Sequence, residues 1–281
     1  MRLLITGAEG MLGRTLMRTL AEVEPIGVDI DECDITDAAA ITTLMERIRP
    51  DTVLHGAAMT AVDRCESESD LAWRVNAIGT GNVAIAAHRN GARLIAISTD
   101  YVFSGDLDRP YHEWDAVGPR SVYGHSKLAG EELVRTHCPD HVIARTAWLY
   151  GPGGPSFVHT MLRLGVEDGP PLKIVNDQIG NPTSTVALAG AIRSLLNAPV
   201  GGTFHLSCEG EATWYELACE VFASQGLTRE VIPCGTQEYP TPAPRPKNSR
   251  LEKRALSLHG LPRMPDWRES LHGFLAEECS E

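Results

Sequence analysis

Two side chains suited to acid–base chemistry, Tyr123 and Lys127, stand four residues apart. In a helix this spacing places both on one face. A free phenol has a pKa of about 10 and exchanges protons poorly near neutrality. A neighbouring ammonium group favours the phenolate and lowers that pKa. The pair therefore predicts a phenol that exchanges a proton with a substrate oxygen, with the lysine tuning it.

A third polar side chain, Thr99, follows the apolar run at 93–98, which we expect to be a strand. Its hydroxyl would reach the same oxygen that Tyr123 addresses. Two donors at the place where alkoxide charge develops form an oxyanion-hole arrangement applied to a ketone. We predict Thr99, Tyr123 and Lys127 as the catalytic residues.

The chain begins with a short apolar run that leads into Gly7, Gly10 and Gly13, spaced as G-x-x-G-x-x-G. In a strand–turn–helix unit, one glycine allows the turn, one lets the backbone approach a pyrophosphate, and one lets the helix pack closely. The helix N-terminus then offers N–H groups and partial positive charge to the phosphates. The motif predicts a nicotinamide dinucleotide held by these glycines together with Met11 and Leu12.

Acidic residues near the end of the second expected strand bear on which dinucleotide binds. Asp29 could accept hydrogen bonds from the adenosine ribose and repel a 2′-phosphate, which favours NADH. Asp34 could flank the adenine. Arg14 and Arg18 could instead approach a 2′-phosphate, so NADPH stays open.

Small residues follow the third expected strand, at Ala57-Ala58-Met59. They would let the flat nicotinamide and its ribose lie close to the backbone. Lys127 would hold the hydroxyls of that ribose, and the positive charge of the oxidised ring would further favour the phenolate of Tyr123.

Together, the glycine motif, Thr99 and the Tyr-x-x-x-Lys pair resemble the signature of the extended short-chain dehydrogenase/reductase family. The resemblance narrows to the dTDP-4-dehydrorhamnose reductase family through five segments spread over nearly the whole chain: 57–63, 98–103, 145–148, 176–183 and 245–251. It implies NAD(P)H-dependent reduction of the C4 ketone of a dTDP-4-keto-6-deoxy-L-hexose, completing dTDP-L-rhamnose.

The same resemblance implies roles on the substrate side. Thr99 and Asp100 would contact the sugar, Tyr123 would donate the proton to O4, and Trp148 would pack on the sugar or the base. Related 4,6-dehydratases carry an Asp-Glu pair after the active-site threonine, whereas here Tyr101 follows Asp100. The carboxylate that would remove the C5 proton is missing, which favours reduction over dehydration.

Some family members place a glutamate after the glycine motif to help bind magnesium at a dimer contact, and the matching residue here is Thr15. A hydroxyl alone is a weak ligand for a hard dication. We therefore expect no metal requirement, and a monomer or a weak homodimer.

The diphosphate of a nucleotide-sugar substrate needs cations, and Arg245, Lys247 and Arg250 follow a proline-rich segment at 239–246. We predict that Arg250 binds substrate. Surface charges beside a loop explain these residues about as well.

Short β-branched runs alternate with helical patterns in the first half of the chain, which predicts an α/β fold with a doubly wound parallel sheet of Rossmann type. The expected strands are 2–6, 25–29, 52–55, 93–98 and 142–145, and the expected helices are 11–21, 38–49, 71–90 and 122–136. After Gly151, glycine- and proline-rich loops interrupt this alternation, although strand and helix patterns continue at 203–206, 186–196, 215–223 and 266–279. We predict a cofactor domain over 1–150 and a smaller substrate-binding lobe over 151–281, some of whose elements return to pack on the first.

The chain of 281 residues has a formal net charge of -12, which argues against nucleic acid or an anionic membrane as a partner. No apolar stretch approaches the about 20 residues that span a bilayer, and nothing resembles a signal peptide. The 7 cysteines are scattered with no C-x-x-C, which favours free thiols in a reducing compartment. We expect a soluble, cytoplasmic enzyme.

Two alternatives stay open. One is a reductase or epimerase acting on another nucleotide-activated deoxysugar. The other is a non-catalytic regulatory subunit of the same fold, similar to the methionine adenosyltransferase beta subunit. A protein that only binds has no chemical need for Thr99, Tyr123 and Lys127 together, which favours the enzyme.

Overall fold

The computed structural model describes residues 1–278, so Cys279, with which the expected terminal helix ends, lies outside the described residues. Six parallel strands form the central sheet in the order β10-β5-β4-β3-β1-β2. Their bounds are β1 Leu3–Thr6, β2 Ile26–Val28, β3 Thr52–His55, β4 Arg93–Thr99, β5 His141–Thr146 and β10 Gly202–His205. The doubly wound α/β fold of the prediction is thereby confirmed.

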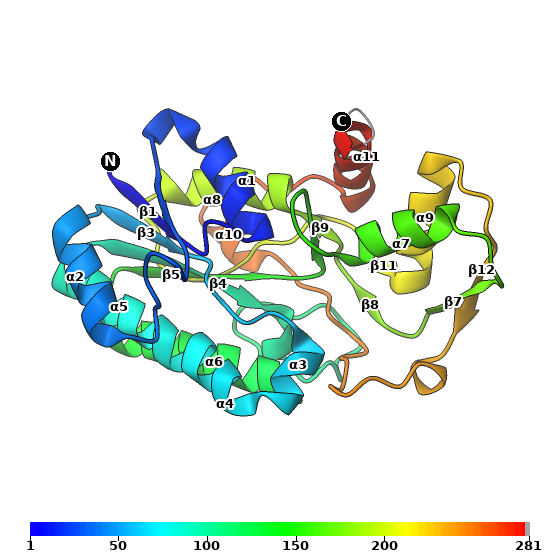
Figure 1. Ribbon diagram of the computed structural model, residues 1–281, viewed down its shortest axis with the longest axis horizontal. Coiled ribbons are helices and arrows are strands. Elements are labelled where there is room, and N and C mark those ends of the chain that lie inside the picture. The colour runs from blue at the N-terminus through cyan, green and yellow to red at the C-terminus, as the bar shows by residue number, and fades with distance from the viewer. Residues whose placement is uncertain (279–281) are drawn as a thin grey trace.

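The strands of this sheet are apolar on both faces, as expected for a sheet covered on both sides. Leu3, Leu4 and Ile5 of β1 are all fully buried. One face is covered by α1 (Met11–Thr19) and α8 (Thr185–Leu196), and the other by α2 (Ala38–Ile48), α5 (Thr80–Arg89) and α6 (Val122–His137). Figure 1 shows these two helical layers above and below the sheet.

The expected single helix over 71–90 is wrong in detail, because three segments replace it. Helix α4 spans Ser69–Trp73, a π-helical turn (η2) spans Arg74–Gly79, and α5 follows. The wider turn carries Asn76, which donates to the Met59 carbonyl (3.0 Å) and accepts from the Met59 amide (2.8 Å). Such turns occur frequently at functional sites, and this one fixes the loop after β3.

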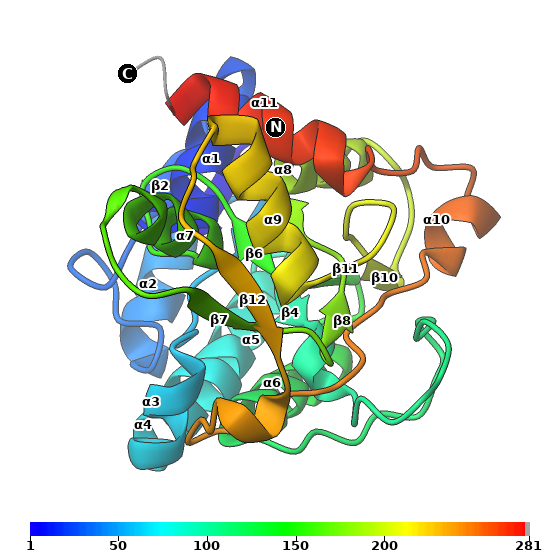
Figure 2. The same cartoon turned by 90° about the vertical axis from the view of Figure 1, so that its right-hand side faces the viewer.

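The second half of the chain builds a smaller lobe from short elements beside the sheet, on the right in Figure 1. Strands β7 (Leu172–Val175) and β12 (Val231–Cys234) pair in parallel, β8 (Ile179–Gly180) pairs antiparallel with β11 (Ala212–Thr213), and β6 (Leu149–Tyr150) pairs with β9 (Thr183–Ser184). Figure 2 shows β7 and β12 side by side with α9 (Trp214–Gln225) next to them. Helix α9 starts with a capping box between Thr213 and Glu216.

The remaining elements are short connections and the C-terminal helices. They are η1 Ala21–Val23, α3 Val62–Ser67, η3 Asp100–Val102, α7 Phe157–Val166, η4 Thr236–Glu238, α10 Arg254–Leu258 and α11 Trp267–Glu278. The division of the chain at residue 150 stays a prediction, while β10 and α8 from the second half lie with the sheet layers.

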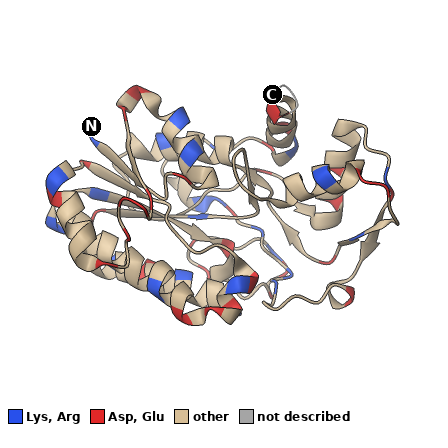
Figure 3. Ribbon diagram, viewed as in Figure 1, with Lys and Arg blue, Asp and Glu red and all other residues tan. Residues whose placement is uncertain are grey.

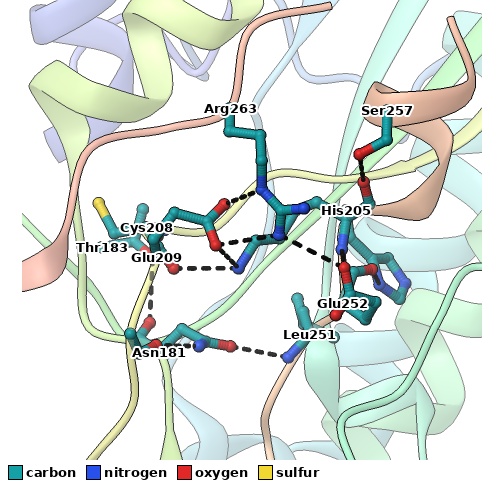
Figure 4. Close-up of polar contacts among 11 residues, drawn as sticks. Asn181, Thr183, His205, Cys208, Glu209, Leu251, Glu252, Ser257 and Arg263 are labelled. Carbon is teal, nitrogen blue, oxygen red and sulfur yellow. Dashed lines mark hydrogen bonds and ion pairs between the residues drawn. The ribbon is translucent and has the colours of Figure 1, made fainter.

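A polar network fastens the segment before α10 to the loops of the smaller lobe (Figure 4). Asn181 accepts from the Leu251 amide (2.7 Å), and Thr183 accepts from the Cys208 amide (3.2 Å). Arg263 binds Glu209 through two hydrogen bonds and also reaches Glu252. Asn181 and Thr183, part of the segment over 176–183, therefore join chain segments that are distant in sequence.

No helix within the described residues is long and apolar enough to cross a bilayer. Figure 3 shows basic and acidic residues interspersed along the helices below the sheet.

Candidate active site

A cavity of about 920 Å³ opens at the carboxyl ends of β1, β3, β4 and β5 and extends toward the smaller lobe. It lies where the strand order reverses between β1 and β3, the point at which ligands of open α/β sheets bind. Its volume suits a dinucleotide and part of a second ligand. Every predicted site residue except Arg250 lines it.

The glycine motif forms a cradle that a side chain would fill. Gly7 has φ +72°, and a Cβ there would lie 2.7 Å from the Ala57 amide nitrogen. A Cβ on Gly13 would lie 2.7 Å from the Cα of Ala8. The turn leads into α1 at Met11, whose first N–H groups have no partner within the helix. These features fit a dinucleotide pyrophosphate.

Asp29 and Asp34 line the end of the cavity beside β2. Asp29 Oδ2 accepts from the Glu9 amide (2.9 Å), so its carboxylate lies against the glycine turn. Arg14 forms an ion pair with Glu9 at 3.2 Å and does not line the cavity, and Arg18 lies near Glu277 at 3.9 Å. The charge at this end of the cavity is therefore acidic, which favours a ribose with free hydroxyls over a 2′-phosphate.

The three predicted catalytic residues, Thr99, Tyr123 and Lys127, meet at the end of β4. Tyr123 is buried at the start of α6, hydrogen-bonded to Thr99, and packs edge-on against Tyr101 at 5.5 Å between ring centroids. Lys127 Nζ donates to the Ile97 carbonyl at 2.8 Å. Ser121 caps α6 by accepting from the Gly124 amide at 3.1 Å, which fixes where the helix starts.

Burial has a larger effect on the pKa of Tyr123 than the sequence suggested. Burial raises the pKa of the Tyr123 phenol, and the hydrogen bond to Thr99 opposes this only in part. The expectation of a lowered pKa is therefore wrong for the protein alone, where Lys127 binds a backbone carbonyl. Tyr123 is consequently protonated at neutral pH, as a proton donor must be.

Burial also shifts the pKa values of Lys127 and Asp100. The pKa of Lys127 is lowered to about 8, with Glu131 opposing the shift. The pKa of Asp100 is raised to about 6, opposed by the hydroxyls of Ser249 and Thr99. Thr99 Oγ1 donates to Asp100 Oδ1 at 3.1 Å, and Asp100 lines the cavity.

Trp148 lines the cavity together with Trp214, a residue to which no sequence motif pointed. Trp148 has φ +47°, a strained conformation for a bulky residue. Trp214 Nε1 donates to Gln178 Oε1 at 3.1 Å, which orients its ring. No local motif could have revealed Trp214, because it reaches the cavity from the N-terminus of α9 in the other lobe.

The structure does not bring Arg250 to the cavity. Its guanidinium binds Glu211 (3.1 Å), Asn248 (2.9 Å) and the Asp108 carbonyl (2.6 Å). Arg245 pairs with Asp63 at 2.8 Å. Among the described residues, Arg64 and Lys127 are the cations that line the cavity, and Arg64 binds Glu68. No motif in the sequence pointed to Arg64.

No cluster of three or more His, Cys, Asp or Glu side chains placed to hold a metal ion occurs within residues 1–278. Thr15 is buried and donates to Thr185 Oγ1 at 2.8 Å.

Comparison with known proteins places this geometry in a family. The family model described as the RmlD substrate binding domain matches residues 1–279. The spore coat polysaccharide biosynthesis protein SpsK of Bacillus subtilis is 41% identical over 99% of this chain and 98% of its own. The dTDP-4-dehydrorhamnose reductase of Salmonella typhimurium is 40% identical over the same shares.

Among solved structures, the dTDP-4-dehydrorhamnose reductase of Bacillus anthracis in complex with NADP superposes with a TM-score of 0.96. It is 41% identical, and the match covers 98% of this chain and 99% of that one.

Proposed function

This chain belongs to the RmlD substrate binding domain family, and on that premise we propose that it reduces the C4 ketone of dTDP-4-dehydro-6-deoxy-L-mannose (dTDP-4-dehydrorhamnose) with NAD(P)H, yielding dTDP-L-rhamnose. The observation that carries the proposal is the meeting of Thr99, Tyr123 and Lys127 at one end of a dinucleotide-sized cavity. Relatives named dTDP-4-dehydrorhamnose reductase at about 40% identity over the full length support the choice of substrate.

In this proposal the cofactor lies along the glycine turn, with Gly7, Gly10, Met11, Leu12 and Gly13 around the pyrophosphate. Asp29 and Asp34 hold the adenosine end, and Ala57, Ala58 and Met59 border the nicotinamide. When bound, the reduced nicotinamide supplies a hydride to C4 of the sugar. Lys127 holds its ribose hydroxyls by giving up the Ile97 carbonyl or by sharing its protons with it.

Tyr123 donates the proton that the new C4 hydroxyl requires. Its buried phenol is protonated at neutral pH, and Thr99 donates a second hydrogen bond to the same oxygen. Together they stabilise the negative charge that develops on O4 as the hydride arrives. Lys127, which is buried and largely charged at pH 7, stabilises the phenolate left behind.

On the substrate side, Asp100 and the Trp148–Trp214 pair face the sugar. Asp100, which lines the cavity, can accept a hydrogen bond from a sugar hydroxyl, and the indoles offer an apolar surface to the 6-deoxy sugar or the base. A role for Arg250 in binding substrate stays a prediction that its present contacts do not support.

The decisive experiment follows NADH and NADPH oxidation with enzymatically prepared dTDP-4-dehydrorhamnose, for the wild type and Tyr123→Phe. Turnover that collapses in the variant, with dTDP-L-rhamnose as product, supports the proposal. A wild type that binds NADH without oxidising it points to the regulatory-subunit alternative. Turnover with a different dTDP-4-keto sugar but not with this one would overturn the choice of substrate.

A further inference from the structure

Glu131 is a buried carboxylate on α6, one turn beyond Lys127, and the mechanism above does not use it. Its side chain is 2% exposed. It accepts hydrogen bonds from Ser98 Oγ (2.6 Å), from Arg145 Nε and Nη2 (2.8 and 2.7 Å) and from Arg135 Nη2 (2.8 Å). Glu131 does not line the large cavity, so it has no direct access to substrate or cofactor.

The position of Glu131 relates it to the reacting groups. Tyr123, Lys127 and Glu131 recur every four residues, which places them along one face of α6. Three consecutive residues at the end of β4 meet that face. Thr99 is hydrogen-bonded to Tyr123, the Ile97 carbonyl accepts from Lys127, and Ser98 donates to Glu131.

Arg145 completes this arrangement from the next strand. It lies on β5 directly opposite Ser98 of β4, and its guanidinium is stacked over the Phe103 ring at 5.0 Å from the centroid. A buried ion pair with several hydrogen bonds contributes little net stability but fixes a geometry strongly, since breaking it leaves an uncompensated charge. The Glu131–Arg145 pair therefore joins α6, β4 and β5 at one point.

We propose that Glu131 is a positioning residue for the ketoreductase: held by Ser98 and Arg145, it keeps α6 in register with the end of β4, so that Tyr123 and Lys127 face Thr99. This inference rests on the proposed function. Its second consequence is electrostatic, because the carboxylate lies near the buried ammonium of Lys127.

The charged surroundings of Lys127 set the direction of that effect. Glu131 raises the pKa of Lys127 against the lowering by burial. Arg145 and Arg135 partly offset the carboxylate charge. Burial and the charge of Lys127 lower the pKa of His55 on β3 to about 3. His55 is therefore neutral and adds no charge beside Lys127. Loss of the Glu131 charge should therefore let Lys127 deprotonate at lower pH.

The test compares Glu131→Gln with Glu132→Gln. Glu132 is the adjacent residue on α6, is largely exposed, and binds the same Arg135 at 2.6 Å, so the control removes an equivalent charge without touching Ser98 or Arg145. For Glu131→Gln we expect kcat to fall by roughly 10- to 100-fold, as misplaced reacting groups predict. The alkaline limb of its pH–rate profile should move to lower pH. For Glu132→Gln we expect kcat and the pH–rate profile to match those of the wild type.

A second measurement does not depend on turnover. Trace acylation of the ligand-free protein, followed by peptide mass spectrometry over a range of pH, reports the pKa of Lys127. We expect the labelling midpoint to fall in Glu131→Gln and to stay in place in Glu132→Gln. If the wild type fails to reduce the sugar, the proposed function fails, while this midpoint still tests the role of Glu131.

If Glu131→Gln does not fold, Ser98→Ala removes one of the four hydrogen bonds and leaves the ion pair. We then expect kcat to fall roughly 5-fold or more, the equivalent of one hydrogen bond, with the cofactor KM unchanged. A Glu131→Gln protein with wild-type kcat and pH profile would overturn the proposal. So would a loss of activity that follows lost thermal stability while the Lys127 midpoint stays in place.

Discussion

Trp148 and Trp214 lie face to face, with 3.5 Å between ring centroids and 5° between ring planes. The first follows β5 of the sheet and the second starts α9 of the smaller lobe, so the stack joins the two parts of the molecule across the cavity. Gly180 lies against the Trp148 ring, and a Cβ there would be 2.5 Å from its Cε2. Trp214 therefore covers one face of the Trp148 ring where both residues line the cavity.

For Trp214→Ala we expect the KM for the sugar nucleotide to rise roughly 5- to 10-fold, since an aromatic pair contributes about 1 kcal/mol. The KM for NADH should stay unchanged, because Trp214 is not among the residues proposed to hold the cofactor. Steady-state kinetics with each substrate varied in turn measures both. Trp214→Phe is the matched control and should keep most of the affinity; an unchanged sugar KM in Trp214→Ala would remove the residue from the substrate site.

For Tyr123→Phe we expect kcat to fall by about 10²- to 10⁴-fold, the usual contribution of a general acid. Binding of NADH, followed by fluorescence titration, should change little because the ring and its packing against Tyr101 remain. A variant that keeps a tenth or more of the wild-type kcat would show that another group donates the proton.

For Gly13→Ala we expect NADH binding to be lost, because the added methyl would lie 2.7 Å from the Cα and carbonyl oxygen of Ala8 in the phosphate turn. The matched control is Gly190→Ala in α8, where nothing lies within 4 Å of an added Cβ. That variant should bind NADH normally and gain about 0.5–1 kcal/mol of stability from its helix propensity. Titration and thermal unfolding of both proteins check this, and normal NADH binding by Gly13→Ala would argue against the proposed pyrophosphate position.

For Asp29→Ala we expect the ratio of kcat/KM for NADH over NADPH to fall roughly 10-fold, since a hydrogen bond to a charged group contributes about 1.5–3 kcal/mol. Glu32→Gln is the control. Glu32 accepts a hydrogen bond from the Asp29 amide at 2.9 Å, so this substitution removes a neighbouring negative charge and leaves the Asp29 carboxylate in place. If the ratio of kcat/KM for NADH over NADPH falls equally in both variants, the overall negative charge of this region, rather than Asp29 itself, sets the cofactor preference.

Asp100 should make stability depend on pH. Burial raises its pKa to about 6 from the usual 3.8, so between these values the folded protein binds more protons than the unfolded chain. Stability contributed by this group is therefore lost as pH rises from about 4 to about 6, by up to roughly 3 kcal/mol. Asp100→Asn should unfold at a higher temperature than the wild type at pH 8 and at a similar one at pH 4. Equal unfolding temperatures at pH 8 would show that the carboxylate is better solvated than its burial suggests.

The sequence predicted those parts of the site in which a local pattern carries the chemistry. The glycine turn, the Tyr123–Lys127 spacing and Thr99 at a strand end each sit within a single strand–loop–helix unit. Their side-chain directions follow from the periods of helix and strand. The parallel sheet follows from apolar runs such as Leu3-Leu4-Ile5, which could only be buried on both faces.

Only the tertiary structure decided which distant residues complete the site. Trp214 reaches the cavity because α9 packs in the other lobe, and Glu131 meets Ser98 and Arg145 because α6 lies across β4 and β5. Arg250, which its position in the sequence made a candidate for the diphosphate, lies instead in a network with Glu211 and Asn248. Burial also decided that the pKa of Tyr123 is raised rather than lowered, since desolvation depends on how completely neighbouring elements cover the phenol. The spacing of residues along the chain does not show how deeply the Tyr123 phenol is buried.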